Sequence, residues 1–160
     1  MTIKVGDRVP SVTLRYLTAE GVKAVPSEEF FKGRKVVVFG LPGAYTRTCS
    51  SRHLPGYVQH AEKLREKGID AVACLSVNDA FVMGAWGKEH GAGEKVTMLG
   101  DGSAEFTTAI GLELDRVKEG MGLRSQRYSM VVEDGVVTAL NVEKPGEYAV
   151  SSAEAMLEKL

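Results

Sequence analysis

The residue most suited to chemistry in this sequence is a cysteine in a Gly/Pro-rich turn. Cys49 ends the stretch GLPGAYTRTC (residues 40–49), which follows an apolar run and precedes a helical pattern. We therefore expect it in the first turn of a helix, where unpaired backbone N–H groups stabilise a thiolate. Arg47 and Arg52 add positive charge, and the Thr46 hydroxyl could point to the same spot. An inert, packed cysteine is the alternative, but the polar surroundings favour a reactive one.

Other side chains could complete a site around Cys49. His53 lies four residues further along the expected helix, so a Cys–His pair of the kind found in cysteine hydrolases is an alternative. No Asn or Asp is evidently placed to orient its imidazole. Arg124 and Arg127 flank the start of a later strand, where either could bind an anion with its guanidinium or remain solvated. The pattern alone leaves these alternatives open.

The second cysteine lies in a different setting. Cys74 is in the middle of AVACLSV (residues 71–77), which is typical of a buried strand, so a core cysteine is the simplest interpretation. Two cysteines do not make a disulfide framework. The chain has three histidines but neither a CxxC nor an HxxxH spacing, so we expect no zinc site.

Composition limits the class of protein. The 160 residues are 44% hydrophobic and 26% charged, which predicts one globular domain over residues 1–160. Lys and Arg number 20 against 21 Asp and Glu, so the chain lacks the basic excess of a general nucleic-acid binder. No stretch approaches the ~18 apolar residues of a membrane span. The N-terminus has no apolar signal core, so a cytoplasmic location is expected.

The expected elements alternate between strands and helices. The apolar pattern predicts strands over Val12–Tyr16, Val22–Val25, Lys35–Leu41, Ala71–Val77 and Val96–Leu99. The first two form a hairpin, and a second hairpin over Ser129–Leu140 turns at Asp134-Gly135, a type I′ signal. This order indicates an α/β fold with a mixed sheet and helices on both faces.

Helix boundaries follow from capping residues, Pro and Gly. Helices are expected over Glu28–Lys32, from Pro55 to just before Gly68, up to about His90, up to about Ile110, and at the C-terminus. The candidate N-caps are Ser27, Asn78 or Asp79, and Ser103. Ser151 to Glu154 has the spacing of a capping box for the last helix. Trp86 is expected in the core or in an interface.

The segment around Cys49 resembles the PxxxTxxC signature of peroxiredoxins. The similarity continues in VACLSVNDAFV (residues 72–82), GLELD (111–115), RSQRYSM (124–130) and NVE (141–143). These motifs occur in the right order over nearly the whole chain and are similar to the type II, atypical branch. The C-terminal VSSAE (residues 150–154) looks most like the plant and bacterial members of that branch.

The resemblance implies a thioredoxin-like fold with a mixed central sheet, flanking helices and an N-terminal hairpin extension. It also implies reduction of hydrogen peroxide and alkyl hydroperoxides without metal, haem or flavin. By position, Cys49 would be the peroxidatic cysteine, Thr46 its hydrogen-bonding partner, Pro42 the shield of the pocket and Arg127 the catalytic arginine. Many members have Pro where this chain has Arg47.

Recycling of the oxidised cysteine has two routes under this resemblance. Glutathione or a glutaredoxin could attack a sulfenic acid on Cys49, or Cys74 could resolve it as an internal disulfide that thioredoxin or glutaredoxin reduces. Plant-like members carry a second cysteine at the spacing of Cys74. We expect the first route, because a cysteine in a buried strand cannot approach Cys49 without local unfolding.

The family commonly forms homodimers near the active-site loop. Tyr45, Phe81 and Leu123 are the candidates for such a patch here, with ordinary core packing as the alternative. Two further readings of function remain beside the peroxidase. One is a redox sensor that passes oxidation to a partner, and the other is a thioredoxin-fold binding module without turnover.

Overall fold

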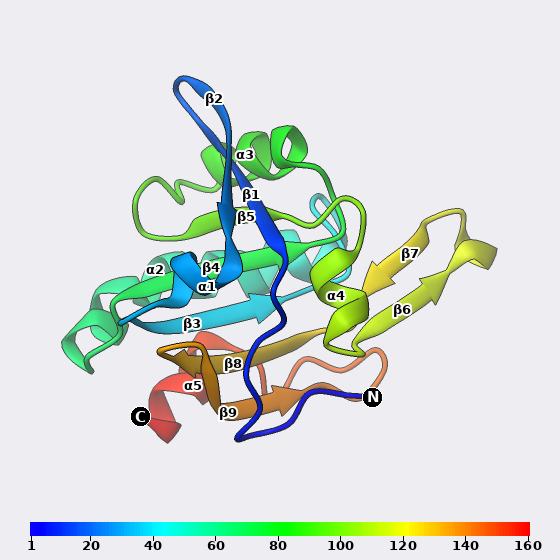
Figure 1. Ribbon diagram of the computed structural model, residues 1–160. Helices are drawn as coiled ribbons and strands as arrows, with labels where there is room; N and C mark the ends of the chain where they lie inside the picture. Colours follow the sequence, from blue (N-terminus) through cyan, green and yellow to red (C-terminus); the bar gives the residue numbers. More distant parts are fainter.

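The computed structural model describes residues 1–160 and contains a seven-stranded mixed sheet (Figure 1). The strand order is β2-β1-β5-β4-β3-β8-β9, in which β3, β4 and β5 are parallel and their outer neighbours β1 and β8 are antiparallel to them. The strands are β1 (Thr13–Thr18), β2 (Gly21–Pro26), β3 (Lys35–Gly40), β4 (Ala71–Ser76), β5 (Thr97–Gly100), β8 (Tyr128–Glu133) and β9 (Val136–Val142). The prediction of an α/β fold with a mixed sheet is confirmed, and the fold is thioredoxin-like.

Helices cover both faces of this sheet. They are α1 (Ser27–Phe31), α2 (Leu54–Glu66), α3 (Ala80–Glu89), α4 (Glu105–Ala109) and α5 (Ala153–Lys159). Leu64, Trp86 and Met156 place α2, α3 and α5 in the hydrophobic cluster of one face. Phe31 and Phe106 place α1 and α4 in the cluster of the other face.

Strand β3 lies in the middle of the sheet and is buried on both sides. Val37 and Phe39 belong to one hydrophobic cluster, whereas Val36 and Val38 belong to the other. The alternation follows from the two-residue period of a strand. This explains why the sequence reads as a continuous apolar run at this point, as predicted.

The two predicted hairpins are present, and a third was not predicted. Asp134 and Gly135 have φ values of 48° and 83°, as a type I′ turn requires. The third hairpin pairs β6 (Glu113–Arg116) with β7 (Gly122–Ser125) around a 3₁₀ turn and projects from the main sheet in Figure 1. Its strands are short, and most of their residues are only partly buried, so they lack the apolar periodicity that signals a strand.

The expected cap at Ser27 is wrong. Its hydroxyl donates to the Pro10 carbonyl oxygen at 2.6 Å and accepts from the Val12 N–H at 2.9 Å, so it ties the N-terminal segment to the first hairpin. The helix starts without a side-chain cap. Ser27 therefore bonds two residues that are distant in the sequence instead of an N–H group of its own helix.

The expected cap at Ser103 is also wrong. The buried carboxylate of Asp101 caps α4 instead, because it accepts from the N–H groups of Phe106 at 3.1 Å and Thr107 at 2.9 Å. Ala104 takes a left-handed conformation with φ of 57°, which carries the chain from the carboxylate into the helix.

The remaining caps are partly as expected. Asp79 caps α3 by accepting from the Val82 N–H at 2.8 Å, which decides between Asn78 and Asp79. The last helix does start near the expected capping box, but its N-cap is Ser152 and not Ser151. The Ser151 hydroxyl donates to Glu143 instead, so the predicted N-cap was one residue too early.

Two further features concern the chain as a whole. No helix has the length and apolar character needed to cross a membrane. No group of three or more His, Cys, Asp or Glu side chains is placed to hold a metal ion.

Candidate active site

Cys49 lies where the sequence placed it, in the first turn of the helix that follows β3. Helical backbone begins at Arg47, and the Cys49 side chain is fully buried. No carbonyl or side chain accepts a hydrogen bond from the Cys49 N–H. An unpaired donor therefore remains beside the sulfur, as expected at a helix start.

The helix does not continue from this turn as a regular α-helix. Cys49–His53 is a π-helical segment, and the Leu54 N–H donates to the Cys49 carbonyl five residues earlier. Pro55 follows directly in α2. In a regular α-helix its ring would clash with the carbonyl of residue 51, and the wider turn avoids that clash.

Arg127 is the arginine that reaches the cysteine. Its Nη2 donates to the Cys49 sulfur at 3.2 Å. The strand register explains the approach, because Gly40 at the end of β3 pairs with Tyr128, the residue after Arg127. A β-carbon at Gly40 would lie 2.1 Å from the Tyr128 ring, so only glycine fits.

Arg124 has a different role from Arg127. Its Nε donates to the Met121 carbonyl at 2.8 Å, and its Nη1 donates to the Pro42 carbonyl at 3.4 Å. Arg124 therefore holds the loop that follows β3 through the Pro42 carbonyl. The alternative that the sequence left open is decided in favour of Arg127.

The second nitrogen of the Arg127 fork is held by His53. Its Nη1 donates to His53 Nδ1 at 2.8 Å, and His53 Nε2 lies 3.0 Å from the Ser151 carbonyl oxygen. Arginine can only donate and a carbonyl can only accept, so His53 is neutral with its proton on Nε2. Burial, and then the charge of Arg127, lower the pKa of His53 to about 3.

This arrangement contradicts the Cys–His alternative. Both nitrogens of His53 have partners, and neither partner is Cys49. A neutral imidazole whose only lone pair accepts from a guanidinium is not available to deprotonate a thiol. The spacing of four residues was a real signal of proximity, but the role that it suggested was wrong.

The Ser151 carbonyl, which accepts the hydrogen bond from His53, is held in place by the segment around it. Glu143 Oε2 accepts from the N–H groups of Ala149, Val150 and Ser151 at 2.8–2.9 Å, and from the Ser151 hydroxyl at 2.7 Å. Burial raises the pKa of Glu143, but these hydrogen bonds outweigh it, so the carboxyl pKa lies below its ordinary value. We call residues 144–150 the strap, since Glu143 ties its far end back to β9.

Tyr148 is the part of the strap that touches the site. Its ring centroid lies 4.5 Å from the Arg52 guanidinium carbon and 5.9 Å from that of Arg127. It also packs edge-on against the His53 ring, with centroids 5.3 Å apart. Arg52 is therefore stacked on the strap and is not directed to the sulfur.

The Thr46 hydroxyl does not make the expected hydrogen bond to the Cys49 sulfur. It donates to the Gly43 carbonyl at 2.7 Å and makes no hydrogen bond to the Cys49 sulfur. The expected Thr46–Cys49 bond is therefore absent from this structure. A hydroxyl has one proton and two lone pairs, so Thr46 remains able to accept but not to donate.

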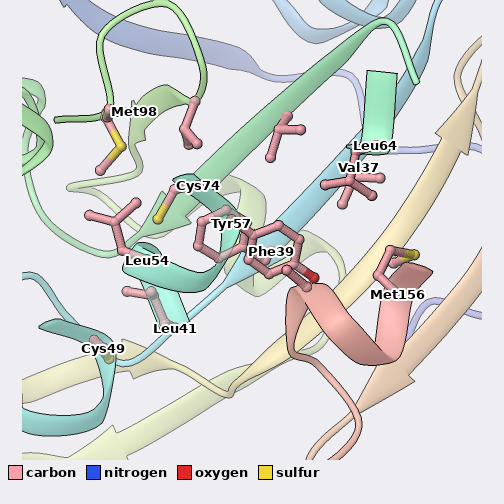
Figure 2. Close-up of a cluster of buried hydrophobic side chains, with 14 of the residues drawn as sticks. Val37, Phe39, Leu41, Cys49, Leu54, Tyr57, Leu64, Cys74, Met98 and Met156 are labelled. Carbon is pink, nitrogen blue, oxygen red and sulfur yellow. The ribbon is translucent and has the colours of Figure 1, made fainter. Parts of the chain in front are cut away.

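Cys74 is buried in β4, in the same hydrophobic cluster as Cys49. Both cysteines are free thiols, and the view of Figure 2 draws Leu41 and Leu54 between them. Burial, and then the nearby Cys49, raise the pKa of the Cys74 thiol well above its ordinary value. These surroundings fit the core cysteine that the sequence suggested.

The candidate interface residues are exposed to solvent, whereas Trp86 is buried. Tyr45, Phe81 and Leu123 are exposed, so the alternative that they are ordinary core is wrong. Trp86 is fully buried, and its indole N–H donates to the Ser50 hydroxyl at 3.0 Å, next to the cysteine.

A pocket of about 470 Å³ opens in front of the site. Pro42, Thr46 and Arg127 line it, so three of the four residues expected from the resemblance share one pocket. The fourth, Cys49, is fully buried next to them and bonded to Arg127. Sequence reasoning missed the positioning role of His53 and the parts of Ser151, Glu143 and Tyr148. The only signals available were the spacing of His53 and the NVE motif that ends at Glu143.

A free thiol held by a guanidinium at a helix start, on a thioredoxin-like sheet, defines a class of thiol-based redox proteins. Comparison with known families agrees with this class. The model named Redoxin matches residues 4–157, and the chain belongs to the Redoxin family.

Individual proteins similar to this chain identify its branch within the family. Peroxiredoxin-2E, chloroplastic, from Arabidopsis thaliana is 50% identical over 99% of this chain and 70% of its own length. Peroxiredoxin-2B from the same plant is 44% identical over 99% of this chain and 98% of its own. The reduced Prx3 of Vibrio vulnificus, solved in complex with hydrogen peroxide, is 52% identical with a TM-score of 0.95 and covers 99% of both chains. The chain is thus a peroxiredoxin, a thiol-dependent peroxidase.

Proposed function

We propose that this peroxidase reduces hydrogen peroxide and alkyl hydroperoxides through a sulfenic acid on Cys49. The observation that carries the proposal is the Arg127 guanidinium, 3.2 Å from the sulfur and held by a neutral His53. The hydrogen peroxide complex of the Vibrio vulnificus relative supports a small peroxide as substrate.

In the first step, the Cys49 thiolate attacks the terminal oxygen of ROOH. The S–O bond forms as the O–O bond breaks, and the departing RO⁻ takes up a proton to leave as ROH. Cys49 is oxidised to the sulfenic acid and the peroxide is reduced. Arg127 and the free Cys49 N–H are the donors that face the developing negative charge, and such donors contribute most of the rate in comparable sites.

Thr46 has the complementary role in this scheme. Because its proton is committed to the Gly43 carbonyl, it offers only lone pairs to a substrate. It therefore accepts from the O–H of the attacked oxygen and orients the O–O bond. Pro42 lines the same pocket and limits the access of water.

For the second half of the cycle, we favour an external thiol. Glutathione or a glutaredoxin attacks the sulfenic acid to form a mixed disulfide and water, and a second thiol releases Cys49. The buried place of Cys74 in β4 supports this route, because a direct disulfide requires local unfolding of the Cys49 turn. An internal Cys49–Cys74 disulfide, reduced by thioredoxin or glutaredoxin, is the competing route. Neither route uses a metal, haem or flavin.

The setting of the enzyme is also a proposal. We infer a cytoplasmic homodimer that contacts its partner through Tyr45, Phe81 and Leu123. Tyr45 lies in the active-site loop, and the exposure of all three side chains supports this surface, because a contact between copies would remove them from water.

One experiment tests the peroxidase cycle directly. One equivalent of hydrogen peroxide is added to the reduced protein, free thiols are alkylated, and the intact mass is measured without reductant. We expect the gain of one oxygen on Cys49 with Cys74 alkylated. Loss of two hydrogens with neither thiol alkylated would replace the external thiol by Cys74, and an unchanged mass would contradict the proposed function.

A further inference from the structure

The pocket beside the Cys49 turn is larger than hydrogen peroxide requires. Its volume is about 470 Å³, and its walls come from the loop after β3, the β6–β7 hairpin and the strap. Pockets for small organic ligands span roughly 300–1,000 Å³. The pocket can therefore admit an organic molecule next to Arg127, which bonds the buried sulfur.

The walls of this pocket are unusually cationic for this chain. Four positive side chains line it against two carboxylates, Glu143 and Glu147; the cations are Arg47, Arg116, Arg127 and Lys144. Glu143 commits one oxygen to the strap. The whole chain has a net charge of −1, so this is a local concentration of positive charge.

Three of these cations do not belong to the proposed catalytic set, and we call them the cationic mouth: Arg47, Arg116 and Lys144. Each comes from a different segment of the chain: the cysteine helix, the β6–β7 hairpin and the strap. Arg47 and Lys144 have no ion-pair partner, and Arg116 has only Glu119 of its own hairpin, at 3.7 Å. Their charges are therefore available to a ligand.

We propose that the cationic mouth binds the carboxylate of an organic reactant of this enzyme. The proposal rests on the proposed function and names its substrate class. The carboxylate could belong to the hydroperoxide that Cys49 reduces or to the thiol that attacks the sulfenic acid. In both cases the reacting atom meets Cys49 and the carboxylate lies outward, where charges converge in a cleft walled by protein.

The hydroperoxide arm of the test compares cumene hydroperoxide with its para-carboxylate. The two share the reacting group and differ by one charge. We expect kcat/KM to favour the carboxylate by about fivefold at low salt, as about 1 kcal/mol of attraction provides. The preference should decline as salt screens the exposed charges.

The thiol arm compares glutathione with its diethyl ester during recycling of the sulfenic acid. Esterification removes both carboxylates and keeps the thiol. A preference for glutathione assigns the mouth to the reducing thiol, and a preference confined to the first arm assigns it to the hydroperoxide.

The variants Arg47→Ala and Lys144→Ala test the residues. Each should lower the carboxylate preference in the responsive arm, and Arg47→Glu should abolish it. Lys67→Ala is the matched control, because Lys67 is exposed, unpaired and at the far end of α2. If neither arm shows a preference, or if the preference survives in Arg47→Glu, the cationic mouth is excluded. Turnover of neutral cumene hydroperoxide in that case would leave the proposed peroxidase intact.

Discussion

The two cysteines of this protein are equally buried and lie in the same hydrophobic cluster, yet their surroundings are opposite. Cys49 starts a helix and receives a hydrogen bond from Arg127. Cys74 lies in a central strand among apolar side chains, and burial raises its pKa. Burial alone therefore does not decide whether a thiol reacts. What distinguishes Cys49 is a fixed positive charge supplied from a distant part of the chain.

The largest expected effect separates the two cysteines directly. Cys49→Ser should lose peroxidase activity by about 10³-fold or more, because the nucleophile is removed. Cys74→Ala should keep most of its activity with a glutathione and glutaredoxin system. Stopped-flow assays with hydrogen peroxide measure both. A Cys74→Ala variant that reacts once and then fails to recycle would show that the two cysteines act together.

The next effect concerns the charge that distinguishes Cys49. Arg127→Lys should lower kcat/KM by about 100-fold, because a single ammonium cannot bond the sulfur and His53 at once. The same peroxide assay measures the loss. Arg15→Lys is the control, since Arg15 pairs with Glu105 on the surface. Near-normal kinetics in Arg127→Lys would mean that charge near the sulfur suffices without the fork.

A smaller effect is expected from the residue that holds the fork. His53→Ala leaves an Arg127 donor unpaired and leaves the Ser151 carbonyl with only the Tyr57 hydroxyl as donor, which should cost about tenfold in kcat/KM. His53→Gln should restore much of the loss, because an amide can accept from Arg127 and donate to Ser151. Such a rescue would show that His53 acts by positioning Arg127 and not merely by filling space. Equal rates in His53→Ala and His53→Gln would contradict this positioning role.

The last effect is on stability rather than on activity, and it takes the form of a pH dependence. The folded pKa of His53, about 3, lies below its ordinary value of 6.5, so the unfolded chain binds the proton more readily. Stability is therefore complete above pH 6.5 and falls as the pH decreases toward 3. The contribution lost by about pH 5 is about 2 kcal/mol. Urea unfolding of wild type and His53→Gln should differ by this pH-dependent amount.

The parts of the fold that sequence predicted are those with a local cause. The apolar run of β3 and the Asp134-Gly135 turn were both readable, because burial and positive φ leave marks in neighbouring residues. Cys49 was readable for the same reason, since its turn is rich in Gly and Pro. The local pattern therefore favoured a reactive cysteine at this position, and the family resemblance added its peroxidatic role.

What sequence could not show depends on contacts between distant residues. Ser27 looks like a helix cap, but its partners lie 15 and 17 residues earlier. His53 looks like a base for Cys49, but its actual partners lie 74 and 98 residues later. Nothing near these positions indicates which long-range partner will take the side chain. The β6–β7 hairpin was missed because its strands carry no apolar period.

The π-helical segment after Cys49 has a consequence for how this helix can change. It contains one residue more than a regular helical turn over the same rise. Deleting any one residue between Cys49 and Pro55 would remove the wider turn and rotate everything on one side of the deletion by about 100°. With α2 anchored in the core, the sulfur would turn away from Arg127. The extra residue thus sets the rotational phase of the nucleophile, and chain length in this segment is as constrained as the identity of the cysteine.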